Sequence, residues 1–261
     1  MRVAADPAAG PGLSPMWLLM YHSVSYTTPD PNRITVTPDR LHRQLAWLRR
    51  NRLRGVSVGE LLRARAAGRA GRMVGLTFDD GYRDFLDTAV PLLRGHGCTA
   101  TVFCLPGRLH GSNAWDTEGP RKRLLNADGI RAVAAAGMEI GSHGLLHQSL
   151  PGLDADALER EIARSRELLA EITGGPVRGF CYPYGAVDQR AIDAVRAAGY
   201  AYACAVDPGR LTGQFALPRV HVGERDNAAR LRLKRLLHPR RRRPLPPLPA
   251  PAESAWSNEA S

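Results

Sequence analysis

Short apolar segments alternate with amphipathic helical segments along most of this chain, and this alternation constrains its fold more than any other feature. The strand-like segments include residues 73–78 (MVGLTF), 99–105 (TATVFCL) and a last one at 216–222. Helices are expected between them, for example after Thr37, where a capping side chain precedes a proline. Repeated β–α units predict an α/β fold, a parallel sheet or barrel covered by helices. Its chemistry is expected at the carboxyl ends of the strands.

The two ends of the chain differ from this central region. Residues 1–15 are rich in Ala, Pro and Gly, lack the apolar segment of a secretory signal, and are expected to be disordered. Residues 16–226 are predicted to form a single domain. Residues 227–261 are predicted to form a basic helix followed by a disordered tail rich in Arg and Pro. The expected location is the cytoplasm, with weak contact of this basic segment with the anionic inner face of the membrane as a further hypothesis.

Composition argues against several other classes of protein. No window holds the roughly 18 consecutive apolar residues that a membrane-spanning helix needs. More than half of the net charge of +11 lies from residue 229 onward, and no recognised nucleic-acid-binding motif accompanies it, so no specific nucleic acid is expected as a partner. The four cysteines form no CxxC pair and are expected to be buried apolar residues. The sequence leaves the oligomeric state open.

Three polar segments follow directly on predicted strands. Residues 77–81 (TFDDG) place two adjacent carboxylates there, which can divide the work between a metal and a proton. Residues 142–147 (SHGLLH) contain two histidines four apart, which on one helical turn would share a face and chelate one ion. Residues 180–185 (FCYPYG) set a tyrosine between proline and glycine, which can direct a backbone N–H toward a ligand. Each segment alone is also a common local pattern, an acidic turn, a chance pair of histidines or a strand-ending turn.

Together and in this order, TFDDG, SHGLLH and FCYPYG resemble the polysaccharide deacetylase family, also called the NodB-homology or carbohydrate esterase 4 group. The early YHSV segment (residues 21–24) and the late LPRV segment (217–220) agree, and the resemblance runs from about residue 16 to residue 222. It implies a distorted (β/α) barrel, commonly of seven strands. It also implies a metal-dependent hydrolase that removes N-acetyl groups from a carbohydrate, either a poly- or oligosaccharide or a lipid- or nucleotide-linked precursor.

The resemblance also implies roles for individual residues. It makes Asp79 the general base, and it makes Asp80, His143 and His147 the ligands of a divalent metal, most often Zn²⁺, with Co²⁺ or Ni²⁺ as alternatives. The residues expected to face the substrate are Tyr182, Pro183 and Tyr184, with the backbone N–H of Tyr184 as a donor to the oxyanion.

The sequence departs from the family pattern at two positions. Family members usually draw a general acid from a late Leu-x-His motif, which has no clean copy here. His221 is the predicted acid and His22 is the alternative. Many members carry an arginine at the position of Cys181, where it pairs with the catalytic aspartate. Arg83 or Arg219 could substitute for it.

Two other functions remain open at this level. The same metal site could cleave an O-acetyl ester or a non-sugar amide, because all these reactions pass through a metal-held tetrahedral intermediate. A catalytically silent relative that only binds sugar or metal is a third reading. The missing arginine and the unclear general acid favour it, whereas the intact Asp79 counts against it.

Overall fold

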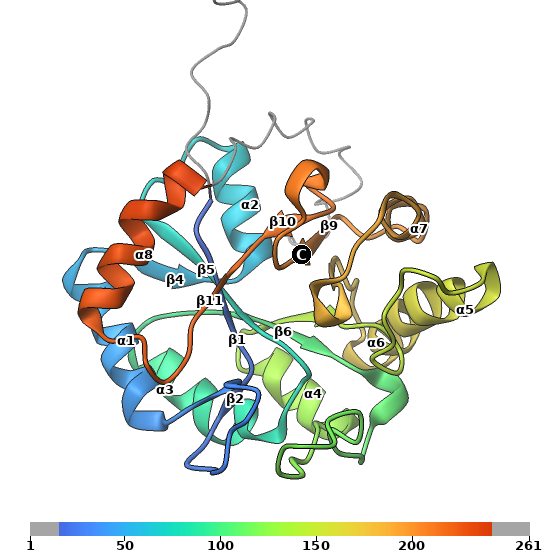
Figure 1. Cartoon of the computed structure of the whole chain (residues 1–261), viewed down its shortest axis with the longest axis horizontal. Coiled ribbons are helices and arrows are strands. Elements are labelled where there is room, and N and C mark those ends of the chain that lie inside the picture. Colours follow the sequence, from blue (N-terminus) through green and yellow to red (C-terminus); the bar gives the residue numbers. More distant parts are fainter. Residues whose placement is uncertain (1–15, 242–261) are drawn as a thin grey trace, which may run out of the picture.

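A computed structural model describes residues 16–241 of the 261-residue chain, with side chains described to residue 238. The predicted disorder of residues 1–15 and of the tail lies outside the described residues. Helices and sheet together form one domain, in which a mostly parallel sheet is nearly closed into a barrel and the helices surround it (Figure 1).

Every strand pair in the main sheet is parallel, as the β–α alternation predicts. The order across the sheet is β10-β9-β8-β7-β6-β5-β1-β11, and β4 adds to β5 outside this path. A separate parallel pair joins β2 to β3. The strand bounds are β1 Leu18–Tyr21, β2 Ser23–Val24, β3 Thr35–Val36, β4 Arg54–Val56, β5 Met73–Phe78, β6 Thr101–Cys104, β7 Glu139–Ser142, β8 Gly179–Cys181, β9 Tyr202–Ala205, β10 Leu217–Pro218 and β11 Val220–His221.

One short segment joins the two edges of the sheet. β10 pairs with β9, β11 pairs with β1, and only Arg219 separates β10 from β11 in the chain. The prediction of one continuous strand over 216–222 is therefore wrong, because the segment leaves one edge of the sheet to reach the other. When β10 and β11 are counted as one split strand, seven strands circle the barrel, as the family resemblance implied.

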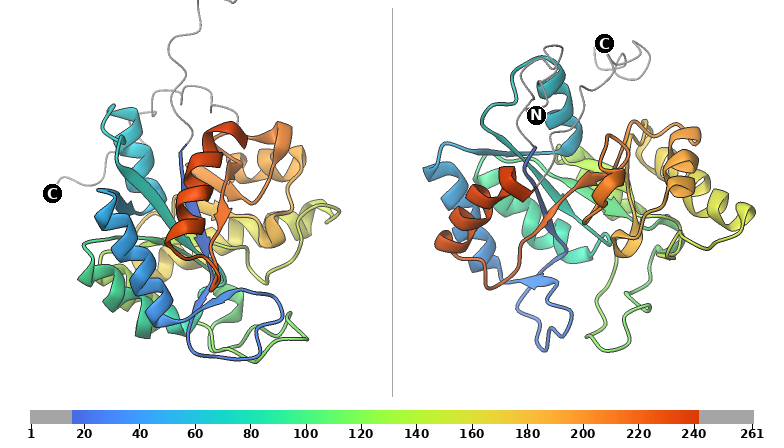
Figure 2. Two further views of the ribbon diagram at one scale, coloured as in Figure 1. Left: turned by 60° about the vertical axis from the view of Figure 1, so that its left-hand side comes forward. Right: turned by 45° about the horizontal axis from the view of Figure 1, so that its top comes forward.

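The helices cover the outside of the sheet (Figures 1 and 2). The Thr37 side chain accepts a hydrogen bond from the Arg40 backbone N–H, so the predicted cap of the first helix is confirmed. The four cysteines are buried and free, also as predicted. The helix bounds are α1 Pro38–Arg50, α2 Val58–Ala66, α3 Val90–Gly95, α4 Ala127–Ala135, α5 Ala155–Glu159, α6 Ser165–Thr173, α7 Gln189–Ala197 and α8 Ala228–Arg241. Irregular turns are η1 Phe85–Ala89, η2 Pro106–Arg108, η3 Arg160–Arg164, η4 Pro183–Gly185 and η5 Gly209–Leu211.

The predicted basic helix is α8, and it packs along α1 (Figure 1). Its Leu231 is buried, and the Gln44 side chain of α1 donates to two backbone carbonyls in the segment that leads into α8. His238 Nε2 lies 2.9 Å from the carbonyl oxygen of Met16, which precedes β1. The described part of α8 is thus attached to the barrel. None of the described helices is both long and apolar enough to cross a membrane.

Candidate active site

The three predicted motif segments meet at one cavity of about 390 Å³. Asp79 and Asp80 follow β5, His143 follows β7, and Tyr184 follows β8. Because these strands are parallel neighbours in one barrel, their carboxyl ends lie at the same rim and bring the side chains together. His22 and His221, which follow β1 and end β11, line the same cavity.

Three buried side chains converge on a point suited to a cation. Asp80 Oδ1 lies 3.3 Å from His143 Nε2 and 3.3 Å from His147 Nε2. His143 Nδ1 lies 2.8 Å from the Cys181 carbonyl oxygen, and because a carbonyl can only accept, Nδ1 carries a proton, so that the neutral imidazole presents the lone pair of Nε2. Three acceptor atoms that face one another, all within 4.8 Å, fit a bound metal ion.

The loop that carries these histidines differs from the prediction. Residues 143–147 form no helical turn, so the explanation of their convergence by i, i+4 helical spacing is wrong. Gly144 has φ 85° and His147 has φ 66°, and these two left-handed residues turn the loop back on itself. The buried Glu161 carboxylate accepts the backbone N–H groups of Leu145 and Leu146 at 2.9 and 3.1 Å, which holds the loop in this shape.

Arg219 is the arginine that pairs with the candidate base. Its Nη1 donates to Asp79 Oδ1 at 2.6 Å and its Nη2 donates to Asp79 Oδ2 at 2.8 Å, a two-pronged ion pair. Both side chains are almost fully buried, at 1% and 4% exposure. The other candidate, Arg83, instead pairs with Asp87 at 3.0 Å on the surface. Of the two arginines considered from the sequence, the fold therefore brings Arg219 to Asp79.

The Asp79 carboxyl stays ionised in this environment. Burial raises the pKa of Asp79, but the Arg219 guanidinium and the nearby His143 and His22 outweigh it and hold the pKa below its usual range. Asp79, His143 and Cys181 also bring ligand atoms near one another. Both Asp79 oxygens already accept hydrogen bonds from Arg219, however, so the set around Asp80 is better suited to a metal ion.

Two further histidines, His22 and His221, line the same cavity. His22 Nε2 lies 3.8 Å from Asp79 Oδ2. His221 Nε2 lies 3.1 Å from the Arg33 carbonyl oxygen, and the two imidazole rings are 6.5 Å apart. Burial, together with His22 and Lys234, lowers the pKa of His221 below its ordinary value. Both histidines predicted as proton donors therefore reach the cavity, and His22 stands at the carboxylate.

Aromatic rings enclose the His147 imidazole. The Trp115 ring stacks on it at 4.4 Å between centroids, and the Tyr184 ring meets it edge-on at 4.5 Å. Tyr184 is 62% exposed, at the rim of the cavity. The other two residues predicted to face the substrate do not line the cavity: Pro183 is buried, and the buried Tyr182 donates its hydroxyl to the carbonyl of Phe215.

Unusual backbone conformations gather at this cavity. Of the six non-glycine residues with positive φ in the described chain, three line it, namely Asp80 (φ 70°), His147 (φ 66°) and Tyr184 (φ 59°). Side chains disfavour this region, so the surrounding contacts must hold these residues in place. Such strain is typical of positions where the direction of a side chain or N–H matters for function.

A largely buried polar cluster lies beside His22 and was not predicted from the sequence. The Lys122 ammonium donates to the hydroxyls of Ser23 and Ser25 at 2.8 Å each. The Ser23 hydroxyl donates in turn to the Asp84 carboxylate, which also accepts a backbone N–H of β2. The cluster ties the long loop after β6 to the strand that directly follows His22. No local pattern signals it, because Lys122 lies 99 residues from Ser23 in sequence.

Comparisons with known proteins agree with this geometry. A family model described as polysaccharide deacetylase matches residues 66–203, more than half of the chain. A protein of Bacillus subtilis (strain 168) classed as a polysaccharide deacetylase, YxkH, is 29% identical over 210 residues, which cover 78% of this chain and 70% of that protein. The poly-β-1,6-N-acetyl-D-glucosamine N-deacetylase of Staphylococcus epidermidis is 23% identical over 199 residues, 72% of this chain and 68% of its own. The structure of Streptococcus pyogenes deacetylase PplD in complex with acetate shares the fold, with a TM-score of 0.72 and 22% identity over 84% of this chain and 96% of that one.

Proposed function

Because the chain belongs to the polysaccharide deacetylase family, we propose that it is a metal-dependent hydrolase that removes N-acetyl groups from a carbohydrate. One observation carries the proposal: a buried Asp–His–His set of acceptors lies in the same cavity as a second carboxylate, Asp79, that an arginine keeps ionised. The relative from Staphylococcus epidermidis is named for an N-acetylglucosamine polymer, so a saccharide that contains N-acetylglucosamine is the proposed substrate class.

Asp80, His143 and His147 would hold the metal. Two imidazoles and one carboxylate are a common protein donor set of catalytic zinc sites, so Zn²⁺ is the proposed ion, with Co²⁺ or Ni²⁺ as alternatives. When bound, such an ion lowers the pKa of a water molecule from 15.7 to about 7 and polarises a carbonyl group. The Cys181 carbonyl fixes the tautomer of His143 in advance, which leaves its Nε2 available as a ligand.

Asp79 would act as the general base. It accepts the proton of the water that attacks the acetyl carbon, and its ionised form is ready because Arg219 and the neighbouring imidazoles lower its pKa. Arg219 also fixes the plane of the carboxylate, since it contacts both oxygens. Arg219 therefore positions the base and takes no proton itself.

His22 would act as the general acid that protonates the departing amine. Its Nε2 lies 3.8 Å from Asp79 Oδ2, so the proposed acid lies close to the proposed base. His221 remains the alternative, although its Nε2 already contacts the Arg33 carbonyl. The Tyr184 backbone N–H is the proposed protein donor to the oxyanion, because Tyr184 lines the cavity beside His147.

Metal content and acetate release together test the proposal. We expect about one divalent ion per chain in wild type and in Asp79→Asn, and none in His143→Ala. Acetate release from a neutral N-acetylglucosamine oligosaccharide is expected in wild type and should fall by about 10²–10⁴-fold in Asp79→Asn. Failure of the wild-type protein to bind zinc, cobalt or nickel would remove the basis of the mechanism. Full activity of Asp79→Asn would exclude Asp79 as the base.

A substrate panel distinguishes amide from ester chemistry. An amine leaves poorly without a proton, whereas the alcohol of an acetyl ester depends less on one. His22→Ala should therefore lose far more activity on N-acetyl than on O-acetyl sugars. If His22 is the acid, His221→Ala should lose less activity on N-acetyl sugars than His22→Ala does.

The cytoplasmic location and the weak membrane contact of the basic segment stay predictions. Sedimentation with anionic liposomes, wild type beside Arg232→Gln/Arg235→Gln, tests the contact.

A further inference from the structure

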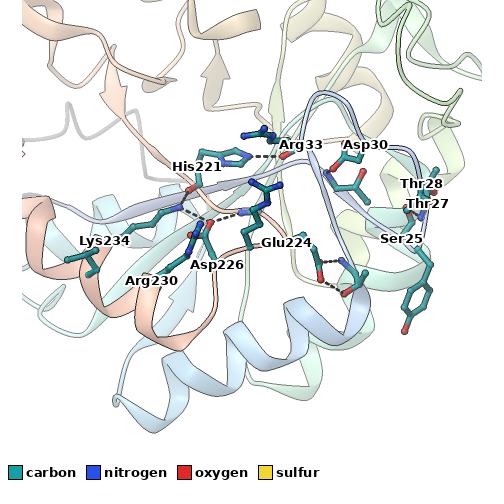
Figure 3. A pocket seen from close by; sticks show the side chains of 16 residues that line it. Ser25, Thr27, Thr28, Asp30, Arg33, His221, Glu224, Asp226, Arg230 and Lys234 are labelled. Atoms are coloured by element: carbon teal, nitrogen blue, oxygen red, sulfur yellow. Dashed lines mark hydrogen bonds and ion pairs between the residues drawn. The ribbon is translucent and has the colours of Figure 1, made fainter.

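A second cavity, of about 740 Å³, adjoins the active-site cavity and has no part in the chemistry above (Figure 3). It lies between the loop that precedes β3 and the start of α8. The side chain of His221 lines both cavities. Along the loop, Asn32 and Ile34 line the active-site cavity, whereas Arg33 and Thr35 line the second one. A ligand that spans this wall would occupy both.

The acidic side chains of the second cavity are already satisfied within the protein. Asp30 accepts two backbone N–H groups at 3.0 and 3.1 Å. Glu224 accepts the backbone N–H of Thr37 at 2.8 Å and its hydroxyl at 3.2 Å. Asp226 accepts a backbone N–H at 2.9 Å and the Lys234 ammonium at 2.7 Å. These carboxylates hold the walls of the cavity together.

The remaining cations of the cavity have no such partner. Arg33, Arg225 and Arg230 are exposed, and no carboxylate in the part of the chain that the structure describes pairs with their guanidinium groups. Arg230 lies in the first turn of α8, which contains no acidic residue. The positive end of the helix dipole adds to its charge there. The cavity lining therefore holds four cations against three carboxylates, a small net positive charge, and its exposed cations are the three guanidinium groups.

A buried hydroxyl in the wall is also unsatisfied. Thr35 lines the cavity with an exposure of 6%, and its Oγ1 has no hydrogen-bond partner among the described residues. Burial of a polar group without a partner costs free energy.

We propose that the second cavity is a subsite for an oxyanion, a phosphate or a carboxylate, carried by the saccharide next to its N-acetylated sugar. Guanidinium groups bind both anions through paired N–H donors, and the cavity volume is within the usual range for ligand pockets. The inference rests on the proposed function and narrows it: the preferred substrate is an acidic saccharide, and His221 stands at the junction between its two parts.

Binding of small sugars tests the subsite without reference to turnover. Arg225→Gln/Arg230→Gln removes two of the free cations, and Arg232→Gln/Arg235→Gln removes the same charge from exposed positions of α8 outside the cavity. In calorimetric titrations we expect wild type and the control to bind N-acetylglucosamine 1-phosphate at least tenfold more tightly than N-acetylglucosamine. The cavity variant should lose about tenfold or more of this affinity. A phosphate preference that persists unchanged in the cavity variant would overturn the proposal.

Kinetics on the metal-loaded enzyme separates the two sources of charge. Acetate release is compared between a neutral chitooligosaccharide, a sugar phosphate and a glucuronate–N-acetylglucosamine disaccharide. A lower KM for either acidic substrate, raised about tenfold in the cavity variant at unchanged kcat, supports the subsite and identifies its anion. Equal KM values for all three overturn it and leave the deacetylase function intact. If none of the three releases acetate, the proposed function fails, and the titrations alone decide whether the cavity binds an oxyanion.

Discussion

The two cavities that meet at His221 are built on opposite electrostatic principles. In the active-site cavity the two carboxylates are buried, Asp79 is paired with Arg219, and Asp80 faces two imidazole nitrogens. In the second cavity the acids are satisfied, whereas three exposed guanidiniums are not. Groups fixed in advance suit a chemical step, because they need no reorganisation during the reaction. Unpaired surface charge suits selection, because a ligand of opposite charge neutralises it.

Removal of the buried Arg219 cation should have the largest effect on stability. Arg219→Met leaves Asp79 buried without its partner, so we expect a loss of about 3–5 kcal/mol in the free energy of unfolding. Urea denaturation measures it. The double variant Asp79→Asn/Arg219→Met removes both charges and should recover part of the loss. If Arg219→Met were as stable as wild type, the ion pair between Asp79 and Arg219 would not contribute to the free energy of unfolding as its geometry indicates.

The same pair sets a pH dependence. The folded pKa of Asp79 is lowered, so the stabilisation by the ion pair is present above the unfolded carboxyl pKa of about 3.9 and is lost as pH falls through the folded pKa. Without Arg219, burial would dominate and raise the pKa of Asp79. In Arg219→Lys, which keeps one charge but loses the two-pronged contact, the acidic limb of kcat/KM should move to higher pH. An acidic limb at the same pH as in wild type would show that Arg219 does not control the ionisation of the base.

The buried cluster beside His22 should show an intermediate effect. Lys122→Met removes a cation that donates to two hydroxyls and lies near the half-buried Asp84 carboxylate, at a cost of about 1–3 kcal/mol in unfolding free energy. The neighbouring Arg123 is exposed, so Arg123→Met is the matched control and should stay within about 0.5 kcal/mol of wild type. Equal losses of stability for Lys122→Met and Arg123→Met in thermal denaturation would mean that the Lys122 cluster makes no specific contribution to stability.

Neutralising the second cavity should have the smallest effect on stability. Arg225→Gln/Arg230→Gln removes cations that pair with nothing in the described chain, one of them at the positive end of a helix. We expect no loss, or a gain of about 0.3–1 kcal/mol that added salt removes. Denaturation at low and high salt measures it. A loss above about 1 kcal/mol would mean that these guanidiniums have partners inside the protein, and the contrast between the cavities would fail.

Local sequence was sufficient for most elements. The strand at residues 73–78 has the predicted bounds, and the helix after Thr37 begins at the predicted cap. The structure brings Asp80, His143 and His147 together, because the segments that carry them follow strands whose ends lie at the same rim, and their role as metal ligands stays a prediction. The geometry of the histidine loop was not predicted from the sequence. Two residues with positive φ and the distant Glu161 shape this loop, and it contains no helical turn.

The sequence by itself determined which chemical groups this protein has and that strand ends would bring them together, because β–α periodicity and motif order are local properties of the chain. Only the tertiary structure decided which arginine pairs with Asp79. Arg219 lies 140 residues away and reaches it because the split between β10 and β11 closes the barrel over the site. The second cavity has the same origin, since loop and helix meet only once α8 packs on α1. Ion pairing and burial depend on distance and desolvation in space, and separation along the chain predicts neither.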